Sequence, residues 1–104
     1  MKNIELIKLF NYLNEHGYCA DIVSKHYCPC VPSTHEQIIV YHYETAERLW
    51  DVAVNPLTMG WNGDLKTSKL EMMGVDKDVI GYLTADDIIT VLQTLENFGV
   101  RCDF

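Results

Sequence analysis

Four residues in a short proline-containing segment carry side chains that zinc prefers. His26, Cys28, Cys30 and His35 supply two imidazoles and two thiols, a suitable ligand set for a tetrahedral zinc ion. One residue separates the two cysteines, whereas structural zinc sites typically use a C-x2-C pair. The segment therefore predicts a loop that carries free thiols. The alternative, which is more specific, is a regulatory site that responds to zinc or to redox conditions. Zinc is the cofactor that the residue types suggest.

The same residues also suit a Cys–His catalytic pair. A thiol at Cys28 or Cys30 can be activated by a neighbouring imidazole, His26 or His35. The Walker, GxSxG, HExxH and GxGxxG patterns do not occur in the chain. His42 is expected within a strand, as a packed or edge residue and not as a base. A small Cys/His enzyme is thus a second alternative, and we expect a binding protein with no catalytic residue.

Two large apolar side chains occupy a glycine-containing loop at residues 57–64. Met59 and Trp61 lie there between polar and small residues. Tryptophan is among the residues that anchor protein interfaces, so the loop predicts contact with a partner protein. The alternative is that Trp61 folds back and covers the core of the sheet.

Acidic residues are densest between residues 76 and 103. We expect Asp76, Asp78, Asp86 and Asp87 to contact a basic partner. For Asp86 and Asp87 a second interpretation is local, because acidic residues stabilise the first turn of a helix.

The overall charge limits the class of partner. Fifteen acidic and eight basic residues give a formal net charge of −7 over 104 residues, and both halves of the chain are acidic. Nucleic acids and anionic membranes require a basic footprint, so we expect neither as a direct ligand. The charge can serve solubility alone. The sharper interpretation is a surface that is complementary to a basic protein surface, such as the groove of a nuclease or another nucleic-acid-binding protein. Phage inhibitors of host defence, of the anti-CRISPR or anti-restriction type, and bacterial immunity proteins act in this way as a class.

The N-terminal residues do not predict a secretory signal. Charged Glu5 and Lys8 interrupt the apolar residues that follow Met1. Apolar runs of the length of a membrane-spanning helix do not occur. We expect a cytoplasmic protein, in which cysteines remain free thiols.

Amphipathic helices are predicted near both ends of the chain. Residues 3–16 and 84–98 each place their apolar side chains on one helical face. Asn3 is the expected N-cap of the first helix, and Thr84 with Asp87 predicts a capping box for the second. Glycines at positions 17 and 99 are suited to end these helices.

Between the helices the pattern changes to short strands. Residues 18–23, 37–43 and 49–54 are predicted strands, with residues 44–47 as a hairpin loop. A fourth strand at residues 66–72 is less distinct. A competing interpretation of the hairpin makes residues 45–50 a short helix.

Together these elements predict one α+β domain over residues 1–104. Strands joined by short turns form antiparallel sheets, so we expect a sheet of three or four strands covered by the N-terminal and C-terminal helices. Only the loops at residues 24–36 and 55–64 then remain for function. Pairing of an exposed edge strand across a two-fold axis would give a homodimer.

Overall fold

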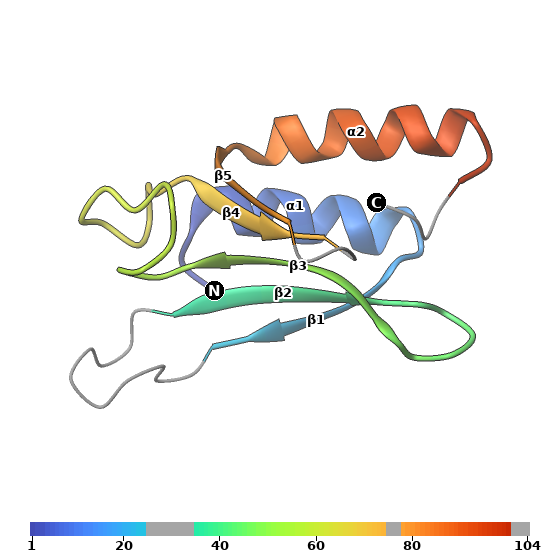
Figure 1. Cartoon of the computed structure of the whole chain (residues 1–104), viewed down its shortest axis with the longest axis horizontal. Coiled ribbons are helices and arrows are strands. Elements are labelled where there is room, and N and C mark those ends of the chain that lie inside the picture. Colours follow the sequence, from blue (N-terminus) through green and yellow to red (C-terminus); the bar gives the residue numbers. More distant parts are fainter. Residues whose placement is uncertain (25–34, 75–77, 101–104) are drawn as a thin grey trace.

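The computed structural model describes residues 1–24, 35–74 and 78–100, which form two helices and five strands. The elements follow one another as α1 (Ile4–Glu15), β1 (Cys19–Val23), β2 (Glu36–Tyr41), β3 (Arg48–Val54), β4 (Leu70–Met73), β5 (Val79–Leu83) and α2 (Ala85–Asn97). The strands form a sheet in the order β1-β2-β3-β4-β5, and each strand is antiparallel to its neighbours (Figure 1).

The predicted α+β class, with a helix near each end of the chain, is confirmed. The prediction of three or four strands is wrong, because the sheet has five. The missed strand is β5, which contains Gly81 and lies at the edge of the sheet. Glycine weakens a strand's local preference, so pairing with β4 determines this conformation more than the local sequence does.

Two strand boundaries differ from the prediction by more than one residue. The strand expected at residues 37–43 ends at Tyr41, and the one expected at residues 66–72 begins at Leu70. The hairpin between β2 and β3 is confirmed over the competing short helix. His42 lies in the turn that follows β2, so its expected position within a strand is wrong.

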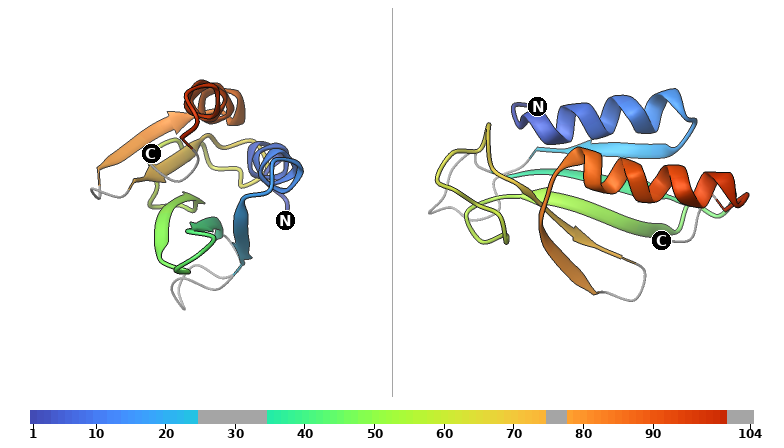
Figure 2. Two further views of the ribbon diagram at one scale, coloured as in Figure 1. Left: turned by 90° about the vertical axis from the view of Figure 1, so that its right-hand side faces the viewer. Right: turned by 90° about the horizontal axis from the view of Figure 1, so that it is seen from above.

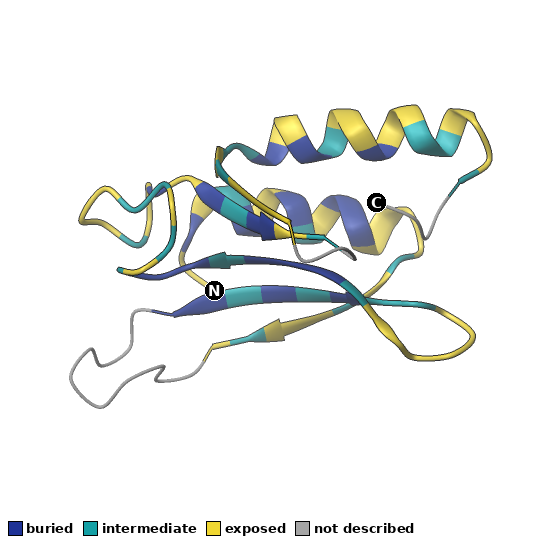
Figure 3. Cartoon of the chain, in the orientation of Figure 1, coloured by how far each residue is buried: buried dark blue, intermediate teal, exposed yellow. Residues whose placement is uncertain are grey.

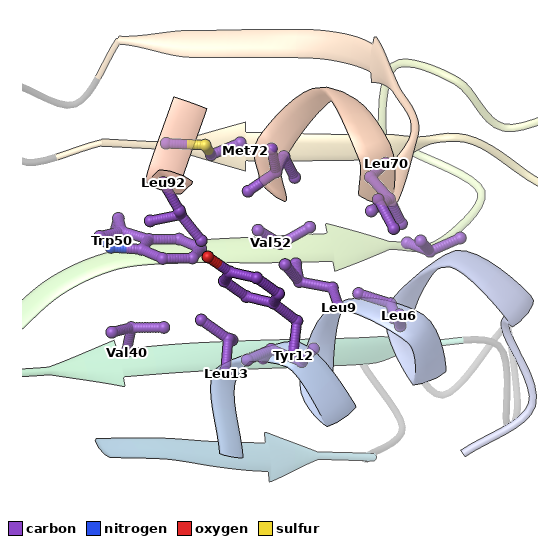
Figure 4. Packing of buried hydrophobic residues seen from close by; sticks show 14 residues of the cluster. Leu6, Leu9, Tyr12, Leu13, Val40, Trp50, Val52, Leu70, Met72 and Leu92 are labelled. Carbon is purple, nitrogen blue, oxygen red and sulfur yellow. The ribbon is translucent and has the colours of Figure 1, made fainter. Parts of the chain in front are cut away.

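Both helices lie against one face of the sheet, which curves around them (Figure 2). Alternate residues of β2, β3 and β4 are buried on this face, as bands along the strands show (Figure 3). They pack against leucine and isoleucine side chains of α1 and α2 (Figure 4). The fully or almost fully buried members include Leu6, Leu9, Leu13, Ile38, Val40, Trp50, Val52, Val54, Leu70, Ile88 and Leu92. Burial of this apolar surface is the main favourable contribution to folding.

Asn3 fixes the start of α1 to two other parts of the chain. Its side-chain oxygen accepts a hydrogen bond from the Leu6 N–H at 2.9 Å, so the predicted N-cap is confirmed. Its amide nitrogen donates to the carbonyls of Leu65 and Ser68 at 2.7 and 3.0 Å. The buried carboxylate of Glu36 accepts from the Asn3 backbone N–H at 2.8 Å, which joins α1 to β2.

The start of α2 has the predicted capping box. The Thr84 hydroxyl accepts from the Asp87 N–H, and the Asp87 carboxylate accepts from the Thr84 N–H. Glu5 of α1 accepts from the Ala85 N–H at 2.7 Å. These bonds place the beginnings of both helices at the same end of the molecule, which we call the far end.

Candidate functional site

A cleft of about 600 Å³ opens at the end of the molecule where both helices stop. Pockets that bind small molecules are commonly of this size. Three separate segments of the chain and one residue of β3 line this cleft. The lining consists of Gly17, Tyr18, Cys19, Val40, Tyr41, His42, Tyr43, Leu49, Gly99 and Val100. We call this region the cleft end.

Glycines end both helices at the cleft. Gly17 and Gly99 have φ values of 75° and 77°, which are left-handed conformations that glycine adopts without a steric penalty. The Tyr18 N–H bonds the Leu13 carbonyl at 2.9 Å, and the Val100 N–H bonds the Leu95 carbonyl at 2.9 Å. The helices stop because these bonds turn the chain away from the helix axes.

The two helix termini also make the cleft end electronegative. A helix carries about half a negative charge at its C-terminus, and basic residues there offset it. Neither α1 nor α2 has a basic residue in its last turn. The negative ends of both helix dipoles therefore lie beside the cleft without a neutralising lysine or arginine in those turns.

Glu96 connects the two helices next to the cleft. Its carboxylate accepts hydrogen bonds from the hydroxyls of Tyr12 and Tyr18 at 2.7 and 2.9 Å. It also lies 3.3 Å from Nδ1 of His16, whose ring stacks on Tyr12 with centroids 3.9 Å apart. Tyr18 lines the cleft, so Glu96 holds one cleft wall in place through this hydroxyl.

His42 has a defined orientation in the hairpin. Its Nδ1 accepts hydrogen bonds from the backbone N–H groups of Glu44 and Thr45 at 3.1 and 3.4 Å. In the neutral ring the proton is therefore on Nε2. The ring stacks on Tyr43 with centroids 5.0 Å apart and planes within 12° of parallel. The pair presents adjacent flat rings at the cleft, and Tyr43 is 66% exposed.

Charges are unevenly distributed between the two ends of the described structure. The last turns of α1 and α2 and the β2–β3 hairpin carry four glutamates: Glu15, Glu44, Glu47 and Glu96. Arg48 is the basic residue beside them, and Asp51 holds its guanidinium at 2.8 Å. The described lysines, Lys2, Lys8, Lys66 and Lys69, lie at or near the far end. The far end also carries Glu5, Glu36, Asp64, Asp86 and Asp87, so charges of both signs lie there. Among the described residues the cleft end therefore has the larger excess of negative charge.

The two apolar residues predicted to contact a partner have different environments. Trp61 is partly buried and packs against the core, which matches the alternative that it covers the sheet. Met59 is 39% exposed, and its backbone N–H donates to Glu71 at 2.6 Å. A Cβ on Gly81 would collide with the Met59 side chain, so this methionine lies directly over β5.

The predicted acidic residues are separated rather than clustered. Asp78 precedes β5, whereas Asp86 and Asp87 follow it, so a strand of five residues lies between them. Asp87 forms the capping box, and Asp86 lies 2.7 Å from the Lys8 ammonium. Asp76 lies outside the described residues.

The predicted zinc ligands lie mostly outside the described part of the chain. This applies to His26, Cys28 and Cys30. His35 is buried, with Nδ1 3.0 Å from the Asn55 amide nitrogen and Nε2 3.2 Å from the Gln37 side-chain oxygen. Both of its ring nitrogens are thus occupied by hydrogen bonds. Within residues 1–24, 35–74 and 78–100, no group of three or more His, Cys, Asp or Glu side chains is arranged to hold a metal ion.

Comparison of the chain with protein-family models, curated proteins and solved structures found no match. In the described residues, none of the helices has the length and apolar character needed to cross a membrane. The cleft and the charges around it are therefore the features of the molecule that bear on function. The sequence signals missed this site, because its tyrosines, histidine and glycines come from distant segments without a common motif.

Proposed function

We propose that this protein is a small acidic binding module that inhibits or masks a basic partner protein, and that the cleft end forms the contact surface. The observation that carries the proposal is the coincidence of an aromatic cleft with the end of the molecule that has the larger excess of negative charge. Aromatic side chains supply contact area at interfaces, and complementary charge steers association and selects the partner.

The kind of partner follows from the charge. Carboxylates in the β2–β3 hairpin and the negative helix ends attract lysine and arginine side chains, and nucleic-acid-binding surfaces are rich in both. The proposed partner is therefore a nuclease or another nucleic-acid-binding protein, whose groove the cleft end occupies in place of phosphates. Inhibition of this kind is typical of phage anti-defence and bacterial immunity proteins.

The proposal includes a cytoplasmic location. Cys19 is a free and exposed thiol at the cleft, and such thiols persist in reducing compartments.

A pair of matched charge reversals tests the proposal. Glu47→Lys changes the hairpin at the cleft end, and Asp86→Lys changes the first turn of α2 at the far end. Each substitution moves the formal net charge from −7 to −5, so the two variants differ in where the charge lies. The 13 residues of α2 separate these regions by about 20 Å.

The wild type and both variants are used as baits in lysate of the cells that encode the chain, and a retained protein is then purified. The proposed contact surface lies away from Asp86, which the sequence pattern predicted to meet the partner and which is paired with Lys8. We expect wild type and Asp86→Lys to retain the same basic protein, and Glu47→Lys to lose it. The purified pair is next tested for competition: added nucleic acid should displace the module from its partner. Equal retention by Glu47→Lys and Asp86→Lys, or binding that nucleic acid does not affect, would contradict the proposal.

A further inference from the structure

We propose that β5 is the contact surface for a second copy of this chain, and that two β5 strands pair antiparallel across a two-fold axis. The sheet of one copy then continues into the sheet of the other. This contact is separate from the proposed binding of a basic partner, because the residues that line the cleft lie outside β5. The observations that carry it are the apolar side chains, the backbone and the charges of β5.

Apolar side chains are exposed along β5. Among the described strands it is an edge strand with β4 as its neighbour, and it lies on the outside of the molecule in both views of Figure 2. Val79, Ile80 and Tyr82 are 42%, 54% and 67% exposed. Beside the strand, Met59 and Met73 are also exposed. Contiguous apolar surface of this kind marks an interaction site.

The backbone of β5 has hydrogen-bonding groups that are directed away from β4. The Gly74 N–H donates to the Asp78 carbonyl at 3.2 Å, so these two residues form a hydrogen-bonded pair. Hydrogen-bonded and non-hydrogen-bonded positions alternate along an antiparallel pair. Val79 and Gly81 therefore direct their N–H and C=O groups outward. Such a row of groups on a sheet edge is a template for another strand.

The outward groups are arranged as a two-fold axis requires, because they lie symmetrically on either side of Ile80. Val79 of one copy then forms a hydrogen-bonded pair with Gly81 of the other. The two Ile80 residues are directly opposite each other at a non-hydrogen-bonded position, where Cα atoms are about 4.5 Å apart and side chains are close. Met59 lies over Gly81, so it packs against Val79 of the second copy.

The charges favour self-pairing at β5 over self-pairing at the other edge of the sheet. Each copy has a net charge of −7, so like charges must stay apart in a dimer. β5 has no charged residue, and pairing about Ile80 places the two Asp78 residues about 13 Å apart along the strands, beyond the Debye length of about 8 Å. In β1 the central residue is Asp21, so self-pairing there sets two carboxylates directly opposite.

A bulge at Tyr82 limits the length of the pairing. Tyr82 has a φ of 60°, which is uncommon for a residue other than glycine, and the register between β4 and β5 shifts between Leu70 and Met72. The regular part of β5 therefore ends at Gly81. Bulges bend an edge strand and prevent extended pairing. We consequently expect a closed dimer that dissociates on dilution.

Analytical ultracentrifugation over a wide concentration range tests the dimer with one substitution on each edge. Ile80 of β5 and Ile22 of β1 are both exposed isoleucines. We expect the wild type to change from a 12.0 kDa monomer to a dimer as the concentration rises. Ile80→Lys should weaken association at least about tenfold, because two ammonium groups become directly opposite, whereas Ile22→Lys should associate as the wild type does. A monomeric wild type, or equal association of the two lysine variants, would overturn the inference.

Disulfide cross-linking tests the register of the pair without a disruptive substitution. Cα atoms about 4.5 Å apart suit a disulfide, so Ile80→Cys should form a covalent dimer when glutathione disulfide is added as the oxidant. The wild type and Ile22→Cys are the controls, since both contain the same four native cysteines. We expect Ile80→Cys to give several times more covalent dimer than either control. Equal amounts of covalent dimer from Ile80→Cys and Ile22→Cys would rule out pairing about Ile80.

Discussion

Replacement of Glu96 by alanine should destabilise the cleft end and the packing of the two helices there. The Glu96 carboxylate accepts from the hydroxyls of Tyr12 and Tyr18, one from α1 and one from the turn that follows it. Its side chain is 20% exposed, so water can replace these bonds only in part. Removal of the carboxylate leaves both hydroxyls without this acceptor in a partly buried position.

The size of the effect follows from these contacts. A buried hydrogen bond to a charged group contributes about 1.5–3 kcal/mol, and partial exposure reduces that figure. Two such bonds predict a loss of about 2 kcal/mol in the free energy of unfolding for Glu96→Ala. In a domain of this size that loss corresponds to a decrease of about 10 °C in Tm.

Urea denaturation of wild type, Glu96→Ala and the control Glu47→Ala measures this difference. Glu47 is an exposed hairpin glutamate, so its truncation should change the free energy of unfolding by less than about 0.5 kcal/mol. A double-mutant cycle with Tyr18→Phe should then show coupling between Tyr18 and Glu96. The reasoning is refuted if Glu96→Ala unfolds at the same urea concentration as Glu47→Ala.

Two further predictions concern the capping box of α2 and the loop that precedes β4. The pKa of Asp87 is lowered from 3.8, first because the Thr84 backbone N–H donates to its carboxylate and also through the Thr84 side chain. The stabilising effect of the Asp87 carboxylate is therefore complete above about pH 4 and is lost as the pH falls through the lowered pKa. The urea midpoints of wild type and Asp87→Asn should consequently differ at pH 7 and converge near pH 2. Gly60→Ala should lower Tm more than Gly63→Ala: both glycines have positive φ, but only at Gly60 would the new Cβ lie 2.8 Å from the Lys69 carbonyl oxygen. Equal Tm values for the two alanine variants would show that this steric contact has no effect.

Local sequence signals were sufficient to predict the two helices. Asn3 and Thr84 begin α1 and α2 as predicted, because an N-cap depends on residues within one helical turn. The hairpin between β2 and β3 was also predictable, since β-branched and aromatic residues flank a polar turn on both sides. Its exact boundary was not, because His42 leaves the strand to accept bonds from the turn backbone.

Strand β5 and the candidate site were not predictable in the same way. The segment Val79–Leu83 is uncharged but contains Gly81, and its strand conformation depends on β4 and on Met59, which lies over it. The cleft brings together residues 17–19, 40–43, 49, 99 and 100, and no local pattern relates these positions. Sequence reasoning placed function in two loops and did not identify this end of the molecule.

The count of charged residues in the sequence likewise did not show where the charges lie in the structure. The two halves of the chain are similarly acidic, yet in the structure the four described lysines lie among carboxylates at or near the far end, whereas four glutamates lie at the cleft end beside one arginine. Several carboxylates also have structural roles, such as Glu36 at the start of α1 and Asp87 at the start of α2. The net charge of −7 therefore overstates the acidity that is free to meet a partner.

The salt dependence of the dissociation constant for the purified partner tests the central claim most directly. At low salt we expect Glu47→Lys to weaken binding about tenfold relative to wild type, and Asp86→Lys to leave it unchanged. The difference should shrink as salt screens the exposed charges. Equal dissociation constants for Glu47→Lys and Asp86→Lys across the salt range would contradict the assignment of the cleft end as the binding surface.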